Sequence, residues 1–96
     1  MAKGYWITFY RSVSNPAALA AYGKVAGPAI QAAGGRFLSR GVALEAFEAG
    51  LKERSVVIEF DSAAKAIEAF ESPAYQAALK ILDGGAERDI RILEGL

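Results

Sequence analysis

Apolar side chains alternate with other residues most clearly between residues 54 and 62. Every second position in this segment is apolar, and these side chains share one face of an extended strand: Val56, Ile58 and Phe60. The opposite face carries Val57 and Glu59. A strand with one wholly apolar face and one mostly apolar face is typical of the middle of a sheet. Glu59 is therefore a carboxylate in the centre of the strand that we expect to be best buried.

The same period of two predicts three further strands, near residues 4–12, 36–47 and 88–94. In the first of these, both faces carry bulky side chains, which also indicates a central position. Gly41 permits a bend within the second strand, and the polar segment 48–52 predicts a hairpin loop before the strand at 54–61. We expect the first and third strands to form the central pair and to run parallel to each other.

Two segments between the strands have the three- and four-residue spacing of amphipathic helices. Asn15-Pro16 favours the start of the first helix, because Asn caps helix N-termini and Pro suits the first helical position. Gly27-Pro28 predicts a kink or a restart, since proline has no N–H to donate. Gly34-Gly35 favours the end of this helix. Ser62 is expected to cap the second helix, which Ser72-Pro73 breaks and starts again.

The resulting order of elements, β-α-β-β-α-β, predicts an α+β protein with a single domain over residues 1–96. Two strand–helix crossovers flank one hairpin, which is the pattern of ferredoxin-like folds. Such a fold is an antiparallel sheet with helices on one face only.

Composition narrows the classes of function. The chain carries 11 Lys plus Arg and 11 Asp plus Glu, so it has no basic surplus to attract nucleic acid or acidic membranes. It contains no cysteine and no histidine, which removes thiol chemistry, the commonest general base and the commonest zinc and haem ligand. We therefore expect no metal and no cofactor. No apolar run approaches the ~20 residues of a membrane-spanning helix, and we expect no leader peptide, so the cytoplasm is the expected location.

Five short segments, taken in their order and spacing, resemble the bacterial family called domain of unknown function 1330. They are Lys3-Gly4-Tyr5-Trp6-Ile7, Gly34-Gly35-Arg36-Phe37-Leu38-Ser39-Arg40-Gly41, Val56-Val57-Ile58-Glu59-Phe60, Ser72-Pro73-Ala74-Tyr75-Gln76 and Ile92-Leu93-Glu94-Gly95. The resemblance covers essentially the whole chain. It implies the dimeric α/β barrel, in which two ferredoxin-like protomers place their open sheet faces together.

What the resemblance implies about activity is broad. The superfamily of this barrel includes cofactor-free monooxygenases, haem-degrading enzymes, muconolactone isomerases and stress-responsive proteins, and the family itself has no agreed reaction. This chain also carries Leu19, Ala74 and Leu82 where many members have Tyr, Glu and Arg. A pocket that uses that arginine in relatives would therefore differ here.

A homodimer is also expected from the sheet itself, because helices can cover only one of its faces. We expect the open face to carry Trp6, Thr8, Tyr10, Val57 and Leu93. Left uncovered, this face would be an apolar patch of several hundred Å², about the most that soluble monomers expose. A second copy related by a two-fold axis would cover it with the same surface.

Four residues are the candidates for a ligand site in the barrel cavity: Trp6, Tyr10, Arg40 and Glu59. Glu59 is the best candidate for a catalytic group, as a base whose pKa is raised by burial. Arg40 is expected on the same face, where it could clamp a carboxylate or enolate. Plainer interpretations are favoured for each: an ion pair between Glu59 and an arginine, and ordinary core packing for the aromatic rings. Arg36 is interpreted only as a solvated strand end.

Two functions remain open on these grounds. One is a binding protein that holds a small organic ligand in the cavity. The alternative is a cofactor-free enzyme, a monooxygenase or an isomerase-like proton abstractor, that uses Glu59 and Arg40. The sequence identifies neither the ligand nor a reaction.

Overall fold

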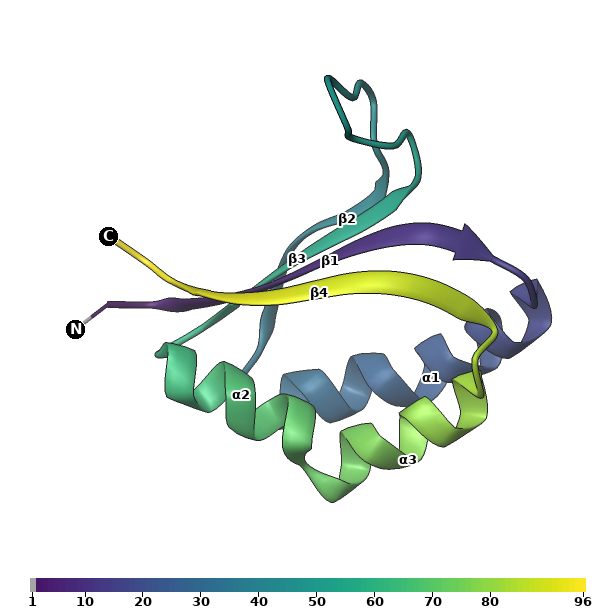
Figure 1. The fold of residues 1–96 in the computed structure, drawn as a ribbon. Helices are drawn as coiled ribbons and strands as arrows, with labels where there is room; N and C mark the ends of the chain where they lie inside the picture. The colour runs from purple at the N-terminus through teal and green to yellow at the C-terminus, as the bar shows by residue number, and fades with distance from the viewer. Residues whose placement is uncertain (1) are drawn as a thin grey trace.

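The computed structural model describes residues 2–96 as a four-stranded sheet with three helices against one face (Figure 1). The elements follow in the order β1 (Gly4–Val13), α1 (Pro16–Ala32), β2 (Arg36–Val42), β3 (Arg54–Phe60), α2 (Ala63–Glu71), α3 (Pro73–Leu82) and β4 (Ala86–Glu94). The predicted α+β order is confirmed, with the second helical segment divided into α2 and α3.

The strands lie in the order β2-β3-β1-β4, so β1 and β3 are the central pair, as predicted. Their predicted parallel direction is wrong, because β1 and β3 pair antiparallel, as do the other neighbours. The reason lies in the connections. The crossover through α1 returns the chain so that β2 runs in the direction of β1, and the hairpin after β2 then reverses β3.

Side chains define the helix ends as the sequence indicates. Asn15 Oδ1 accepts a hydrogen bond from the Ala18 N–H at 3.0 Å, and Ser62 and Ser72 cap α2 and α3 in the same way. The predicted restart near Gly27-Pro28 is wrong, since α1 continues through Pro28 to Ala32. One missing N–H removes one bond of the helical ladder, and the bonds around it suffice to keep the helix continuous.

The second strand is shorter than predicted and ends at Val42 instead of residue 47. Residues 43–53 form a long arm that extends from the end of the β2–β3 hairpin, away from the helices (Figure 1). A bulge interrupts β2 at Leu38, because Phe37 pairs with Ile58 and Ser39 with the adjacent Val57.

The core lies between the sheet and the helices. Paired residues of neighbouring strands share a face, and Trp6 pairs with Ile58. Trp6, Thr8 and Tyr10 are therefore buried against the helices, and their predicted place on the open face is wrong. The open face instead carries Tyr5, Ile7, Phe9, Val57 and Leu93. Within residues 2–96, no helix is long and apolar enough to cross a membrane.

Candidate functional site

Glu59 lies on the open face of the sheet, as predicted, but within an ion pair. Arg36 Nε donates to Glu59 Oε1 at 3.1 Å, and the Tyr5 hydroxyl donates to Oε2 at 3.1 Å. These two hydrogen bonds, Arg36 first, lower the pKa of Glu59 below its usual value. Glu59 is thus a paired and ionised carboxylate, and Arg36, interpreted from the sequence as a solvated strand end, is its partner.

The predicted pairing of Glu59 with Arg40 is wrong, because Arg36 is the residue opposite Glu59 and a bulge at Leu38 turns Arg40 to the other face. Strict alternation from Arg36 would place Arg40 on the open face, the face that carries Glu59. The extra residue shifts the pattern by one, so that Arg40 pairs with Val56. Val56 faces the helices, and Arg40 therefore lies on the opposite side of the sheet from Glu59.

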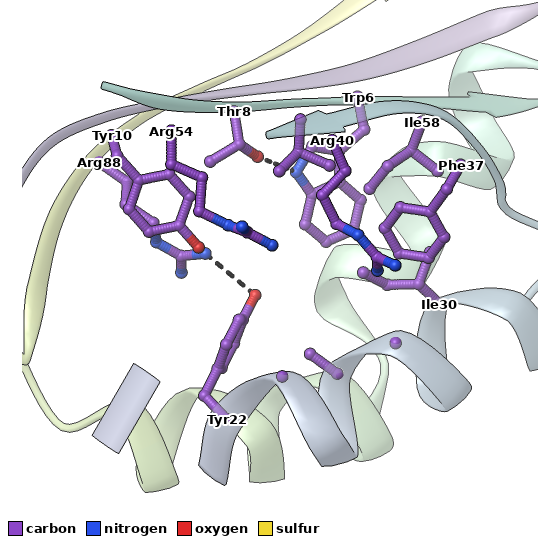
Figure 2. A pocket seen from close by; sticks show the side chains of 14 residues that line it. Trp6, Thr8, Tyr10, Tyr22, Ile30, Phe37, Arg40, Arg54, Ile58 and Arg88 are labelled. Atoms are coloured by element: carbon purple, nitrogen blue, oxygen red, sulfur yellow. Dashed lines mark hydrogen bonds between the residues drawn. The ribbon is translucent and has the colours of Figure 1, made fainter. Parts of the chain in front are cut away.

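Arg40 instead borders a pocket between α1 and the helix-facing side of the sheet (Figure 2). Trp6, Thr8 and Tyr10 of β1 form part of its wall, together with Val56 and Ile58 of β3. The helix α1 contributes Tyr22, Gly23, Ala26, Gly27 and Ile30. The cavity is small, about 60 Å³, and its mouth is open to solvent.

Three guanidinium groups from three different strands line this pocket: Arg40 of β2, Arg54 of β3 and Arg88 of β4. No Asp or Glu is among the lining residues. Within residues 2–96, none of the three arginines forms an ion pair, whereas Arg36 and Arg91 on the open face both do. The pocket is thus a concentration of positive charge in a chain whose formal net charge is zero.

Aromatic faces support these cations in place of carboxylates. The Arg88 guanidinium carbon lies 4.9 Å from the ring centre of Tyr22 and 5.6 Å from that of Tyr10. The Arg54 carbon lies 6.0 Å from the Tyr10 ring centre, and the Arg40 carbon lies 4.8 Å from the ring centre of Phe37. A ring face attracts a cation but leaves its N–H donors free for other partners.

Arg88 also joins two phenols. Its Nη1 donates to the Tyr22 hydroxyl at 2.9 Å and its Nη2 to the Tyr75 hydroxyl at 3.4 Å, while the two hydroxyls lie 2.7 Å apart. Burial, reinforced by the proximity of Tyr75, raises the pKa of Tyr22, so this phenol stays protonated at neutral pH.

The hydrogen bonds of the Tyr22 hydroxyl decide whether its O–H is free to donate to a ligand. Tyr75 is fully buried, so its O–H proton needs an acceptor inside the protein. The Tyr22 oxygen lies 2.7 Å away and can accept it, and we therefore assign Tyr75 as the donor. The Tyr22 oxygen then accepts from both Arg88 and Tyr75, and its own O–H is left to donate into the pocket. The Thr8 hydroxyl is similar, since it accepts from Trp6 Nε1 at 2.9 Å and keeps its own proton to donate.

The side chains of the pocket therefore present donors without a carboxylate acceptor, which suits an anion. A general base is not among the lining residues, and within residues 2–96 no cluster of three acidic side chains gathers that could hold a metal ion. The arrangement can bind and orient a negatively charged group and can stabilise charge on its oxygens.

Three of the four candidates from the sequence, Trp6, Tyr10 and Arg40, meet at this pocket, and Glu59 lies outside it. Sequence reasoning missed Tyr22, Arg54 and Arg88. A signal for Arg88 existed, because it pairs with Tyr10 across the sheet, but finding it requires the antiparallel register of β1 and β4.

Comparison with known proteins gives the same fold. The family model described as Domain of unknown function (DUF1330) matches residues 3–96. No protein of established description matches the sequence significantly. A protein of unknown function from Rhodopseudomonas palustris superposes with a TM-score of 0.73 at 21% identity, covering 99% of this chain and 83% of the other.

Two further solved structures are similar over most of their length. A dimeric ferredoxin-like protein of unknown function from Thermobifida fusca has a TM-score of 0.54 at 18% identity, over 96% of this chain and 90% of the other. A putative antibiotic biosynthesis monooxygenase from Nitrosomonas europaea has a TM-score of 0.58 at 14% identity, over 98% and 90%. At these identities the likeness shows a ferredoxin-like fold and no activity.

Proposed function

Since the chain belongs to the Domain of unknown function (DUF1330) family, whose description gives no reaction, we propose a function from the pocket itself. The protein binds a small organic anion between α1 and the sheet. Arg54 and Arg88 hold the negative group together with the O–H of Tyr22, and Arg40 closes the mouth beside Phe37.

One observation carries this proposal: three guanidinium groups converge on a pocket that no carboxylate lines. Arg54 and Arg88 are half-buried and Arg40 is exposed. Bringing like charges together, two of them partly out of water, costs free energy, so such cations normally have acidic partners. Elsewhere the chain does pair arginines with acidic residues, as Arg36 with Glu59 and Arg91 with Asp89 on the open face. An anionic ligand supplies the missing counter-charge at the pocket.

The alternative of an enzyme that abstracts a proton with Glu59 and Arg40 finds no support in this geometry. The two side chains lie on opposite faces of the sheet, and Glu59 is already occupied by Arg36 and Tyr5. Ligand binding is therefore the function that the arrangement supports best.

Replacing Arg54 with glutamine is expected to weaken the binding of small carboxylates about tenfold, because a hydrogen bond to a charged group contributes about 1.5–3 kcal/mol. Titration of the protein with carboxylates, followed by chemical shifts of the pocket residues, measures this loss. Lys24→Gln is the matched control, since it removes one positive charge from an exposed position of α1. Equal affinity in the Arg54 variant and the wild type would contradict the proposal.

We also propose that two copies associate through the open face of the sheet. Phe9 and Leu93 on that face are 44% and 51% exposed in the single chain. Burial of such apolar area is favourable by about 25 cal/mol per Å². The T. fusca protein and a ferredoxin-like protein from Bacteroides fragilis are both described as dimeric, which supports the proposal by analogy.

Sedimentation at micromolar concentration is expected to give twice the mass of the 10.2 kDa chain. Phe9→Asp should return the protein to a monomer, because a two-fold interface would bury two unpaired carboxylates. Ile81→Asp places the same change at a partly exposed site on α3 and should leave the dimer intact. A monomeric wild type would refute the proposed assembly.

The cytoplasm remains the proposed location. A sequence without cysteine folds without disulfides and so suits a reducing compartment. Fractionation of cells that express the chain tests this, and recovery from a membrane or secreted fraction would contradict it.

A further inference from the structure

The pocket has two chemically different ends. Resting on the proposed function, we infer that its ligand is a short aliphatic carboxylate with a single orientation. The carboxylate lies at the end formed by Tyr22, Arg54 and Arg88, and the alkyl chain lies at the end formed by Ile30, Phe37 and Ile58.

Figure 2 shows this division of the pocket directly. Tyr10, Tyr22 and Arg88 gather at one end, with the guanidinium of Arg54 reaching towards the centre. Ile30, Phe37 and Ile58 lie together at the other end, where the Arg40 guanidinium carbon lies 4.8 Å from the Phe37 ring centre. The two ends differ in the donors that they offer. Arg54, Arg88 and the Tyr22 O–H donate at one end, whereas Arg40, whose side chain is exposed, is the one cation beside the three apolar side chains at the other. A ligand with a single negative group is therefore held best with that group beside Arg54 and Arg88.

Two glycines of α1 supply an independent observation. Gly23 and Gly27 lie one helical turn apart and both border the pocket, and a Cβ built on either meets no atom within 4 Å. A glycine inside a helix destabilises it relative to alanine, and here no packed neighbour requires one. The missing methyl groups leave room in the pocket. The room beside Gly27 lies about one turn before Ile30, at the apolar end.

The size of the cavity selects among anions. About 60 Å³ holds roughly four water-sized groups, since one such group needs ~10–15 Å³ by this measure. A carboxylate with two to five further carbons fits when its head lies beside Arg54 and Arg88 and the end of its alkyl chain reaches the mouth beside Arg40 and Phe37. A free phosphate would fill only the polar end and leave the apolar end and the space beside Gly27 unused.

The test is a series of straight-chain acids, namely acetate, propionate, butyrate, pentanoate and hexanoate, titrated against the full chain. Affinity is expected to rise about fourfold for each added CH₂ up to butyrate or pentanoate and then to level off. Butyramide, which keeps the shape and lacks the charge, is expected to bind at least tenfold more weakly than butyrate.

Gly27→Ala tests binding of the alkyl chain independently of binding of the carboxylate. Its added methyl group occupies the space of the alkyl chain, so binding of pentanoate should fall about tenfold while binding of acetate stays within twofold. The variant should fold at least as well as the wild type, because alanine favours the helix, and its melting temperature verifies this. Equal losses for acetate and pentanoate would overturn the assigned orientation.

The outcomes distinguish this inference from the proposed function. If inorganic phosphate binds as tightly as butyrate and depends on Arg54, the anion site stands and the carboxylate assignment is wrong. If affinity does not change with chain length, the assigned apolar end is wrong. If no anion binds in a way that depends on Arg54, both the inference and the proposed function fail.

Discussion

Replacing Trp6 with alanine is expected to lower the free energy of unfolding by about 3–5 kcal/mol, the range for large aromatic truncations in a core. Trp6 is only 1% exposed and lies at the centre of an aromatic cluster. Its ring centre is 4.8 Å from that of Tyr75, 5.5 Å from that of Phe70 and 6.3 Å from that of Phe60. The free energy of unfolding of a domain is roughly 5–15 kcal/mol in total, so the variant should lose a large fraction of its stability.

Urea unfolding of the variant against the wild type measures the difference from the two midpoints. Trp6→Phe is the control, because it keeps most of the apolar contact and loses the bond from Nε1 to Thr8. A loss of about 1–2 kcal/mol is expected for it. A loss below 1 kcal/mol in the alanine variant would show that the cluster around Trp6 does not hold the sheet against the helices.

The fold was predictable from the sequence because its signals are local. Period-two runs, the caps at Asn15, Ser62 and Ser72, and the order of elements are each encoded within a few residues. The direction of β3 relative to β1 depends on the connections, because the crossover through α1 makes β2 parallel to β1 and the hairpin then makes β3 antiparallel to both. The length of β2 failed because apolar residues continue into the arm, where Leu44 and Phe47 are almost fully exposed.

The candidate site was predictable only in part. One inserted residue explains why Arg40 lies on the other face of the sheet from the one predicted. The bulge at Leu38 moves Arg40 from the face of Glu59 to the helix-facing side. A single inserted residue leaves no clear trace in the composition or period of a seven-residue strand. Placing Trp6 on the wrong face had a different cause, because both faces of β1 carry aromatic and aliphatic side chains and alternation alone cannot choose between them.

The arginines of the pocket illustrate a further limit of sequence reasoning. Arg54 and Arg88 stand near the starts of β3 and β4, where a solvated strand end is the ordinary interpretation of a charged residue. They come to one place because β3 and β4 both run antiparallel to the central β1, which brings these starts near the end of β1 that carries Tyr10. Convergence of like charges is a property of the topology and appears in no single segment.

Arg88→Met is expected to change stability little while removing anion binding. Methionine is unbranched and can pack on the rings of Tyr10 and Tyr22. Replacing a charge that is partly removed from water with an apolar side chain is often neutral or stabilising. The free energy of unfolding should therefore stay within about 1 kcal/mol of the wild type. Affinity for butyrate should fall by about 2 kcal/mol or more, about 30-fold, because the cation that the Tyr22 and Tyr75 hydroxyls hold in place at the polar end is lost.

Arg88→Lys is the matched variant, since it keeps the charge but not the planar fork that reaches both Tyr22 and Tyr75. It should retain part of the affinity that methionine abolishes, which separates the role of charge from that of geometry. If Arg88 were only structural, methionine would lower stability by several kcal/mol and leave the affinity of the folded fraction unchanged. Urea unfolding and butyrate titration on the same samples distinguish the two roles. If Arg88 serves the ligand, its removal lowers the affinity and leaves the free energy of unfolding nearly unchanged.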